Sequence, residues 1–213
     1  MIPPEAFALI LEELERRPLP VNHYREKTGD GRSQAFGVVN KRCQPPDYSR
    51  QCWKRPYLYK LLLDFGRDWV TDISWNAITL NQNYSAGKHY DRGNIGPSFL
   101  VGCGDYQGGA LLCHEGDLSG AHDIRFTPLI TDFSATLHSV APWTGNRVSL
   151  VFYTLKNAPP LPPPSVREEN GSWHFYRGEE RIGRKGLGNH PITLFHQRRK
   201  AQAAQAAEKE DGE

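Results

Sequence analysis

The chain has 213 residues, of which 38% are hydrophobic and 23% are charged, and its formal net charge at pH 7 is +2. These values are typical of one soluble globular domain with short appendages. No apolar run approaches the length of a membrane-spanning helix, and the four cysteines form no CxxC pair of the kind found in zinc sites. We therefore expect no membrane partner, free thiols and a reducing intracellular compartment, nuclear in a eukaryote and cytoplasmic otherwise. The sequence leaves the oligomeric state open.

Two helices are predicted in the first third of the chain. The first begins at Pro3 and Pro4 and ends before Pro18, and its apolar residues recur at helical spacing, at Phe7, Ile10, Leu11 and Leu14. The second covers RPYLYKLLLDFGRDWV, residues 55–70, with its leucines on one face. Residues 22–50, between the two helices, are polar and rich in turn-forming residues, and KTGDGRS within them is predicted to be a loop.

From Trp75 onward the sequence changes to short β-like runs separated by Gly, Asp and Pro. The runs are WNAITLNQNY, SFLVGCG, GGALLCHE, DIRFTP, LITDFSATLHSV and NRVSLVFYTLK, and the last has the strongest strand character. Short strands at regular spacing predict a β-sandwich or jelly roll. Because helices precede this block and would pack on one sheet face, the fold class is predicted to be α+β.

The chain is predicted to have three parts. Residues 1–157 form the main domain, with the N-terminal helices and a jelly-roll core from about residue 75. Residues 158–200 form a Pro-rich strap, APPLPPPS, and a basic C-terminal extension, and residues 201–213 form a low-complexity tail. Basic residues outnumber acidic ones in the first sixty residues and in the extension, whereas the centre is near neutral. This distribution suits either a polyanion partner or an ordinary solvated surface.

The segment GKHYDRGNIGPS contains a histidine and an aspartate two positions apart. In an extended segment such residues point to the same side, so His89 and Asp91 could bind one metal ion. Two histidines and one carboxylate form the facial triad of non-haem Fe(II) oxygenases. His138, in a later strand, is the best third ligand, and His114 and His122 are the alternatives. Taken alone, an HxD pair is also compatible with a hydrogen-bonded loop.

Arg147 opens the strand RVSLVFYT, nine residues after His138. Its neighbours are strongly apolar, which indicates a central strand rather than a surface one. A guanidinium matches a carboxylate with two parallel hydrogen bonds and stays charged when buried, so Arg147 could hold a dicarboxylate. Ser149 lies on the same face of the strand and could add a hydroxyl donor.

With these motifs, the sequence resembles the Fe(II)/2-oxoglutarate-dependent dioxygenases, whose shared pattern is HxD…H…R on a double-stranded β-helix (jelly roll). Within that superfamily, RVSLVFYT, NQNYSAGKHYDRGNIGPS and GDYQGGALL look like the TET/JBP group, which oxidises methyl groups of pyrimidine bases in nucleic acids. The resemblance covers about residues 75–156. It implies that Fe(II), 2-oxoglutarate and O₂ take part in the reaction. His89, Asp91 and His138 would ligate the iron, and Arg147, assisted by Ser149, would bind the distal carboxylate of 2-oxoglutarate.

The resemblance assigns four more residues. Asn81 and Asn83, in the strand before HxD, match positions that contact the cosubstrate in AlkB-type relatives. Asn94 stands where TET-like enzymes place an asparagine that contacts the target base, and Tyr153 stands where they place an aromatic that stacks on it. From the residues alone, Asn94 is equally compatible with a turn cap and Tyr153 with a core aromatic.

Three functions remain open from the sequence. The first, which we favour, is oxidation of a methylated pyrimidine base, 5-methylcytosine or thymine, in DNA. The base would flip into the iron site, and the basic stretch KRCQPPDYSRQCWKRPY would face the phosphates. The second is 2-oxoglutarate-dependent hydroxylation of a protein side chain or a small molecule. The third is a catalytically inactive jelly-roll binding module, in which the motif residues are coincidental.

Overall fold

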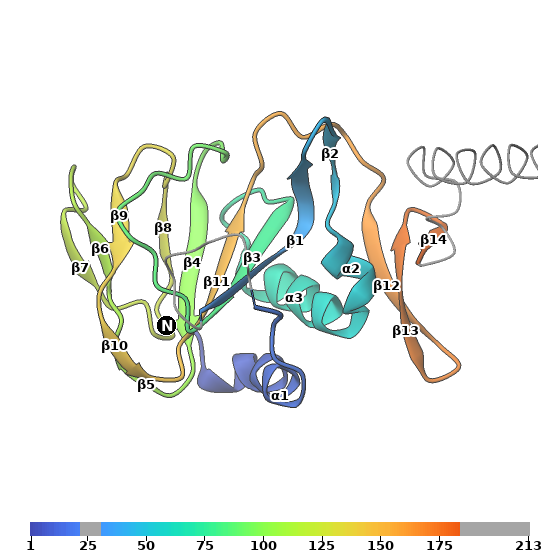
Figure 1. Ribbon diagram of the computed structural model, residues 1–213, viewed down its shortest axis with the longest axis horizontal. Helices are drawn as coiled ribbons and strands as arrows, with labels where there is room; N and C mark the ends of the chain where they lie inside the picture. The colour runs from blue at the N-terminus through green and yellow to red at the C-terminus, as the bar shows by residue number, and fades with distance from the viewer. Residues whose placement is uncertain (22–30, 184–213) are drawn as a thin grey trace, which may run out of the picture. The chain divides into compact units, whose positions relative to one another are not determined.

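The computed structural model describes residues 1–21 and 31–183 (Figure 1). The chain divides into two compact units, Met1–Leu161 and Pro162–Glu213. The predicted tail, residues 201–213, and the second part of the predicted basic extension lie outside the described residues. In the described part of the chain, no helix is both long enough and apolar enough to cross a membrane. The three-part domain organisation stays a prediction.

A six-stranded antiparallel sheet forms the centre of the first unit. Its strands, in spatial order, are β2 (Gln44–Tyr48), β1 (Arg32–Lys41), β3 (Ala77–Gln82), β11 (Val148–Tyr153), β4 (Ser98–Cys103) and β8 (Leu129–Thr131). The strand with the strongest sequence signal, β11, lies between β3 and β4, as its apolar composition predicts.

Residues 22–50, polar and turn-rich in sequence, contain β1 and β2, and the loop prediction for KTGDGRS is wrong for its last two residues, which belong to β1. Two features of the sequence conceal these strands. Gly37 in β1 adopts a φ of +72°, and a Cβ there would lie 2.4 Å from the backbone oxygen of Asn76, so glycine permits this close approach to β3. Strand β2 contains Pro45 and Pro46, which a sheet tolerates here because β2 is an edge strand.

Two small sheets complete the jelly roll (Figure 1). One has the order β7-β6-β9 and the other pairs β10 with β5; the strands are β5 (Tyr106–Gly108), β6 (Leu111–Cys113), β7 (Gly120–His122), β9 (His138–Val140) and β10 (Trp143–Gly145). A buried cluster joins the two layers, because Leu100 of β4 packs with Leu111 and Cys113 of β6 and with Ile124 and Phe133. The predicted double-stranded β-helix is confirmed.

The run LITDFSATLHSV, predicted as one strand, supplies strands to two sheets. Its first residues form β8 in the central sheet, and its last residues form β9 in a small sheet. A turn separates them, in which the Ala135 N–H donates to the Asp132 carbonyl at 3.1 Å. This turn carries His138 to the side of the barrel opposite the central sheet.

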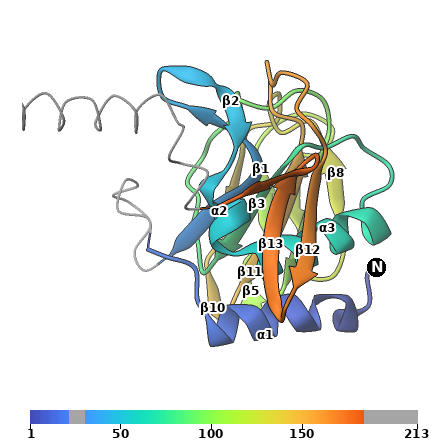
Figure 2. The same ribbon diagram turned by 90° about the vertical axis from the view of Figure 1, so that its right-hand side faces the viewer.

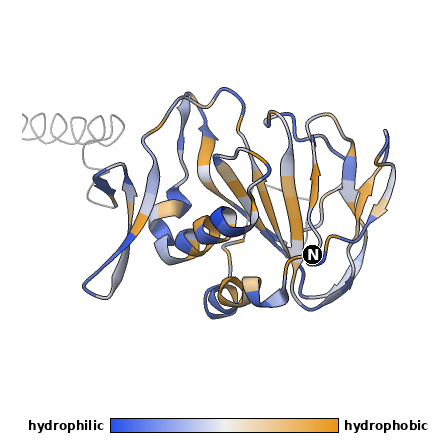
Figure 3. Cartoon of the chain, turned by 180° about the vertical axis from the view of Figure 1, so that it is seen from behind, coloured by the Kyte–Doolittle hydropathy of each residue, from blue (hydrophilic) through white to orange (hydrophobic). Residues whose placement is uncertain are grey.

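Helices cover the outer face of the central sheet (Figure 1). They are η1 (Pro4–Phe7), α1 (Ala8–Arg16), α2 (Arg50–Lys54) and α3 (Pro56–Trp69), so both predicted helices are confirmed. Aromatic side chains fill the space between the layers: Phe65 of α3 stacks on Phe152 of β11, and Tyr59 of α3 stacks on Phe36 of β1, each pair with ring centroids 5.9 Å apart. Figure 3 shows apolar residues along the central strands and on the helices that cover them.

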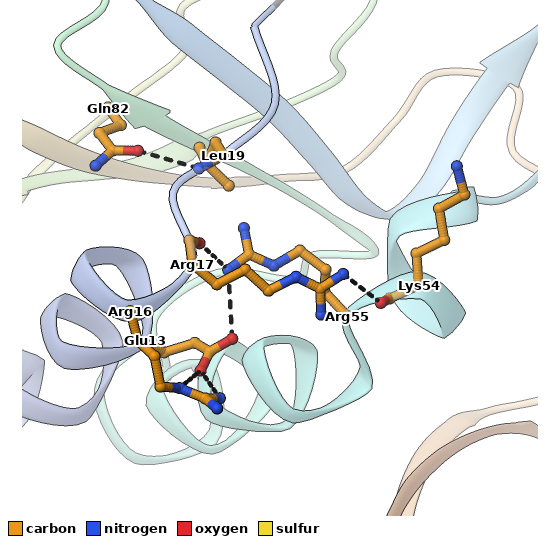
Figure 4. A network of polar contacts seen from close by, with 7 residues as sticks. All are labelled: Glu13, Arg16, Arg17, Leu19, Lys54, Arg55 and Gln82. Carbon is orange, nitrogen blue, oxygen red and sulfur yellow. Dashed lines mark hydrogen bonds and ion pairs between the residues drawn. The ribbon is translucent and has the colours of Figure 1, made fainter.

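A buried ion pair connects α1 to the start of α3 (Figure 4). The Arg55 Nη2 donates to Glu13 Oε1 at 3.3 Å and also to the carbonyl of Arg17, and both charged side chains are nearly inaccessible to solvent. The other carboxylate oxygen of Glu13 binds the exposed Arg16. The prediction that the basic stretch around Arg55 faces phosphates is therefore wrong for Arg55, whose charge is held between helices by Glu13.

The second unit contains a three-stranded antiparallel sheet of order β12-β13-β14 (Figure 2). Its strands are β12 (Pro164–Glu169), β13 (Ser172–Arg177) and β14 (Glu180–Ile182). Asn170 and Gly171 form the turn between the first two strands, with φ values of 51° and 73°. Such positive φ values at both positions are typical of the Asn-Gly hairpin turn.

Candidate active site

The alternation of side chains along β11 places one face of the sheet against the helices and the other toward the barrel interior. Phe152 contacts Phe65 of α3, whereas Ser149, Val151 and Tyr153 line an internal cavity. The cavity has a volume of about 510 Å³ and receives residues from β1, β3, β4, β6, β9, β11 and the loop between β3 and β4. The lining includes these predicted site residues: Asn81, His89, Asp91, Asn94, His138, Arg147, Ser149 and Tyr153.

The three predicted metal ligands lie together at the wall of this cavity. One ligand atom from each of His89, Asp91 and His138 lies within 4.8 Å of the others. The distance from His89 Nε2 to Asp91 Oδ1 is 3.4 Å, and the centroids of the two imidazole rings are 4.3 Å apart. Two backbone hydrogen bonds between His89 and His138, of 3.0 and 3.1 Å, hold their segments side by side.

Backbone carbonyls orient both imidazole rings. His89 Nδ1 lies 2.8 Å from the Gly87 carbonyl oxygen, and His138 Nδ1 lies 2.8 Å from that of Thr136. Because a carbonyl can only accept, each Nδ1 carries the proton, and each Nε2 is left with a lone pair for a metal ion. Burial lowers the pKa of His138, which favours the neutral imidazole that binds a metal. The donor set and its orientation therefore fit a 2-His-1-carboxylate metal site.

The two alternative histidines do not belong to this cluster. His114 Nε2 is 2.8 Å from the Ser139 hydroxyl oxygen, and His122 Nε2 is 2.7 Å from the Leu118 carbonyl oxygen. Neither histidine lines the cavity. Of the three candidates for the third ligand, the structure brings His138 to the pair.

Arg147 is buried in the same cavity, with 2% of its surface exposed. Its Nε donates to the Gly109 carbonyl at 3.1 Å, and its guanidinium carbon lies 5.7 Å from the ring centroid of Tyr106 and 5.6 Å from that of Trp143. Burial lowers the pKa of the guanidinium, and no carboxylate in the described part of the chain counters that effect. Since a buried charge is costly unless it is paired, this arrangement is suited to an anionic ligand.

The side chain of Asn83 lies outside the cavity lining, next to the backbone of Arg147. Its Oδ1 accepts the backbone N–H of Arg147 at 2.8 Å, and the backbone N–H of Asn83 donates to the Arg147 carbonyl at 2.7 Å. The structure thus differs from the predicted contact with the cosubstrate, because Asn83, with a φ of 50°, fixes the strand position from which Arg147 projects.

A polar row crosses the floor of the cavity from β1 to β11. Ser33, Asn81 and Ser149 are in register on three neighbouring strands. Asn81 Nδ2 donates to the Ser149 hydroxyl at 3.2 Å. Side chains that lie opposite one another on neighbouring strands and on the same sheet face are neighbours, so these three residues form a polar strip. Ser149, at one end of the strip, is two residues after Arg147 in the chain.

The two predicted base-contacting residues also line the cavity. The Asn94 N–H donates to the Asp91 carbonyl at 2.9 Å, which fixes Asn94 relative to the metal ligands. The Tyr153 hydroxyl accepts a hydrogen bond from Thr79 at 3.4 Å, and the tyrosine keeps part of its surface exposed, unlike its neighbour Phe152. This placement fits a cavity wall better than a sealed core position.

Sequence reasoning missed the contribution of β1 to the site. Ser33, Ala35, Val39 and Asn40 line the cavity, although no strand was predicted in their segment. The signal was present, since small and polar residues alternate with Phe36 and Val38 at the period of a strand.

No family model and no curated protein matches this sequence. Among solved structures, the chain is similar to NgTET1 in complex with 5mC DNA, with a TM-score of 0.50, 15% identity, and coverage of 74% of this chain and 70% of that one. This chain therefore shares its fold with NgTET1. The predicted resemblance is therefore confirmed at the level of the fold.

Two further structures show weaker likeness. One is a 2OG-Fe(II) oxygenase family oxidoreductase from Burkholderia pseudomallei, with a TM-score of 0.46, 18% identity, and coverage of 67% of this chain and 74% of that one. The other is a Pseudomonas putida prolyl-4-hydroxylase, with a TM-score of 0.45, 15% identity, and coverage of 73% and 89%.

Proposed function

We propose that this protein is an Fe(II)/2-oxoglutarate-dependent dioxygenase. His89, Asp91 and His138 would hold Fe(II), and Arg147 would hold the distal carboxylate of 2-oxoglutarate. When bound, Fe(II) supplies, with 2-oxoglutarate and O₂, the power to oxidise a C–H bond of the substrate. The observation that carries the proposal is Arg147, a buried cation without a carboxylate partner in the described residues, in the same cavity as a 2-His-1-carboxylate cluster.

The residues around Arg147 are suited to binding a dicarboxylate. Its guanidinium can donate two parallel hydrogen bonds to one carboxylate, and the aromatic rings of Tyr106 and Trp143 keep water from it. The polar strip of Asn81 and Ser149 offers further donors beside it. Asn83, which holds the Arg147 backbone, acts as a positioning residue.

We further propose that the substrate is a methylated pyrimidine base, 5-methylcytosine or thymine, in DNA. The support is the fold likeness to NgTET1 together with the position of Asn94 and Tyr153 in the cavity wall. A flipped base could stack on the Tyr153 ring and receive hydrogen bonds from the Asn94 amide. A cavity of about 510 Å³ has room for a base beside 2-oxoglutarate.

Hydroxylation of a protein side chain or a small molecule is the second candidate, and one observation favours it. The predicted phosphate-facing stretch offers fewer free cations than its sequence suggests, because Arg55 is buried against Glu13 and Lys41 binds Asp47 at 2.6 Å. Among its remaining basic residues, Arg42, Arg50 and Lys54 are exposed.

A substrate comparison tests the proposal. Purified protein is supplied with Fe(II), 2-oxoglutarate and O₂, and succinate is measured with four substrates: a thymine-free DNA duplex that carries 5-methylcytosine, its unmethylated twin, a duplex that carries thymine but no 5-methylcytosine, and a proline-containing peptide. We expect succinate and a gain of one oxygen on the methylated base of the first or the third duplex, with the unmethylated, thymine-free twin as the background. Turnover on the peptide without turnover on any of the three duplexes would replace the DNA proposal with the second candidate, and absence of 2-oxoglutarate binding would reject both.

A further inference from the structure

Glu115 contacts both chain segments that carry the candidate metal ligands. It lies two residues after the end of β6, and its Oε1 accepts hydrogen bonds from the hydroxyl of Tyr90 and from the backbone N–H of Leu137, the latter at 3.1 Å. Tyr90 is the residue between His89 and Asp91 in the chain, and Leu137 directly precedes His138. A single carboxylate oxygen is therefore shared by the neighbours of all three ligands.

Other contacts strengthen this connection. The guanidinium of Arg92 lies 5.7 Å from the ring centroid of Tyr90, so the ring that reaches Glu115 is also packed against a cation. On the other side, the His114 N–H donates to the Leu137 carbonyl at 2.9 Å. The end of β6 thus binds Leu137 through both its N–H and its carbonyl.

The segment that carries His89 and Asp91 is partly exposed to solvent, with 41% and 30% of the two side-chain surfaces accessible. Its backbone is joined to the rest of the barrel by the His89–His138 pair and by the Asp91 N–H, which donates to the Phe133 carbonyl at 2.9 Å. On its two sides, the Ala86 carbonyl accepts the Val140 N–H at 3.1 Å and the Gly93 carbonyl accepts the Lys156 N–H at 2.8 Å, so Tyr90 and its hydroxyl lie between fixed points. A segment of this kind would lose conformational freedom on metal binding unless other contacts had already ordered it.

We propose that Glu115 is a positioning residue that holds the His89–Asp91 segment and the His138 segment in the spacing a metal ion requires. The inference rests on the proposed function in one respect, namely that the three ligands bind a divalent metal. Glu115 itself does not reach the metal ligands; it acts through the Tyr90 hydroxyl and the Leu137 amide.

Titration with Co(II), followed by its visible absorption, measures this role without turnover. Removing a residue that orients metal ligands typically lowers metal affinity by about 10- to 100-fold. We expect Glu115→Ala to lower the affinity for Co(II) by about tenfold. Glu115→Gln keeps an oxygen that accepts both hydrogen bonds, so its affinity should recover to within about threefold of wild type. Asp117→Ala removes an exposed acid two residues away and should bind Co(II) as wild type does.

A double-mutant cycle identifies the route of the effect. Tyr90→Phe removes the hydroxyl alone and should weaken Co(II) binding, and adding it to Glu115→Ala should cause little further loss, because both changes break the same hydrogen bond. Amide exchange in the metal-free protein gives a second readout, in which Leu137 should exchange faster in Glu115→Ala than in Asp117→Ala.

The outcomes separate the two proposals. If wild type binds Co(II) and Glu115→Ala binds it equally well, the role of Glu115 is overturned and the metal site stands. Losses that add fully in the double mutant would also overturn it, since the carboxylate would then act by charge rather than through Tyr90. If wild type binds no Co(II), the metal site is rejected and the positioning role falls with it.

Discussion

Two arginines are buried in the described part of the chain, and replacing each by methionine should have opposite consequences. Arg147 and Arg55 are similarly inaccessible, at 2% and 4% exposed. Arg55 has Glu13 at 3.3 Å, whereas Arg147 has no carboxylate partner in the described part of the chain. Arg147→Met should therefore weaken 2-oxoglutarate binding with little change in stability, and Arg55→Met should lower stability without changing 2-oxoglutarate binding.

The magnitudes follow from what each substitution leaves behind. Arg147→Met removes an uncompensated charge and one hydrogen bond to Gly109, so the free energy of unfolding should change by no more than about 1 kcal/mol. The same substitution removes a charge-assisted pair of hydrogen bonds to 2-oxoglutarate, which makes the free energy of binding less favourable by about 1.5–3 kcal/mol. The Kd of 2-oxoglutarate should therefore rise by about 10- to 150-fold.

Arg55→Met leaves the Glu13 carboxylate buried, and breaking such a pair typically costs about 3–5 kcal/mol. The remaining contact of Glu13 with Arg16 places the expected loss near the lower end, about 3 kcal/mol. For a chain of this size that corresponds to a fall in Tm of about 6–12 °C.

Two measurements on the same preparations test this contrast: thermal unfolding of the ligand-free protein, and anaerobic calorimetric titration of 2-oxoglutarate into protein loaded with Mn(II) in place of Fe(II). Arg147→Lys serves as the matched control, because it keeps the charge but not the planar pair of donors, and it should restore part of the affinity. Arg147 does not hold 2-oxoglutarate if Arg147→Met binds it as tightly as wild type does, and its charge is not uncompensated if Arg147→Met unfolds at as low a temperature as Arg55→Met.

Three further predictions concern the site and its substrate. Alanine in place of His89, Asp91 or His138 should abolish succinate formation, while the Tm stays near that of wild type. Turnover in any of these three variants would contradict their assignment as metal ligands. Tyr153→Ala and Asn94→Ala should reduce turnover on methylated DNA and leave the Kd of 2-oxoglutarate unchanged; a Tm lowered in Tyr153→Ala by a core truncation, with activity per folded molecule retained, would show a packing role instead. Binding to a DNA duplex should weaken steeply with salt, and Lys54→Gln should reduce that slope by about one unit if Lys54 contacts a phosphate, whereas salt-independent binding would count against the DNA proposal.

The sequence predicted those parts of the structure in which local pattern and tertiary environment agree. The spacing of the apolar residues in α3 predicted a helix with one buried face, and the structure buries that face. The apolar composition of β11 predicted a central strand, and most residues of β11 are buried. Few residue types can ligate a metal ion or hold a carboxylate, so the sequence alone indicated the HxD pair, His138 and Arg147. The fold brings these residues to one cavity.

The failures occur where a local signal was weak or was overridden by a neighbour. Gly37 and the prolines of β2 indicate turns on their own, and their place in a sheet depends on Asn76 and on the edge position of β2. The burial of Arg55 depends on Glu13, which is distant in sequence, so no local pattern could reveal it. In contrast, the Asn170–Gly171 hairpin carried a clear sequence signal that was not used.

A crystal structure with Fe(II) and 2-oxoglutarate, grown without O₂ and measured at the iron absorption edge, tests the proposed site. We expect one anomalous peak in contact with the Nε2 atoms of His89 and His138 and with an Asp91 oxygen. We also expect electron density for 2-oxoglutarate that reaches from this peak to the guanidinium of Arg147. A fully loaded crystal with its iron peak elsewhere, or with 2-oxoglutarate away from Arg147, would reject the proposed roles of these residues.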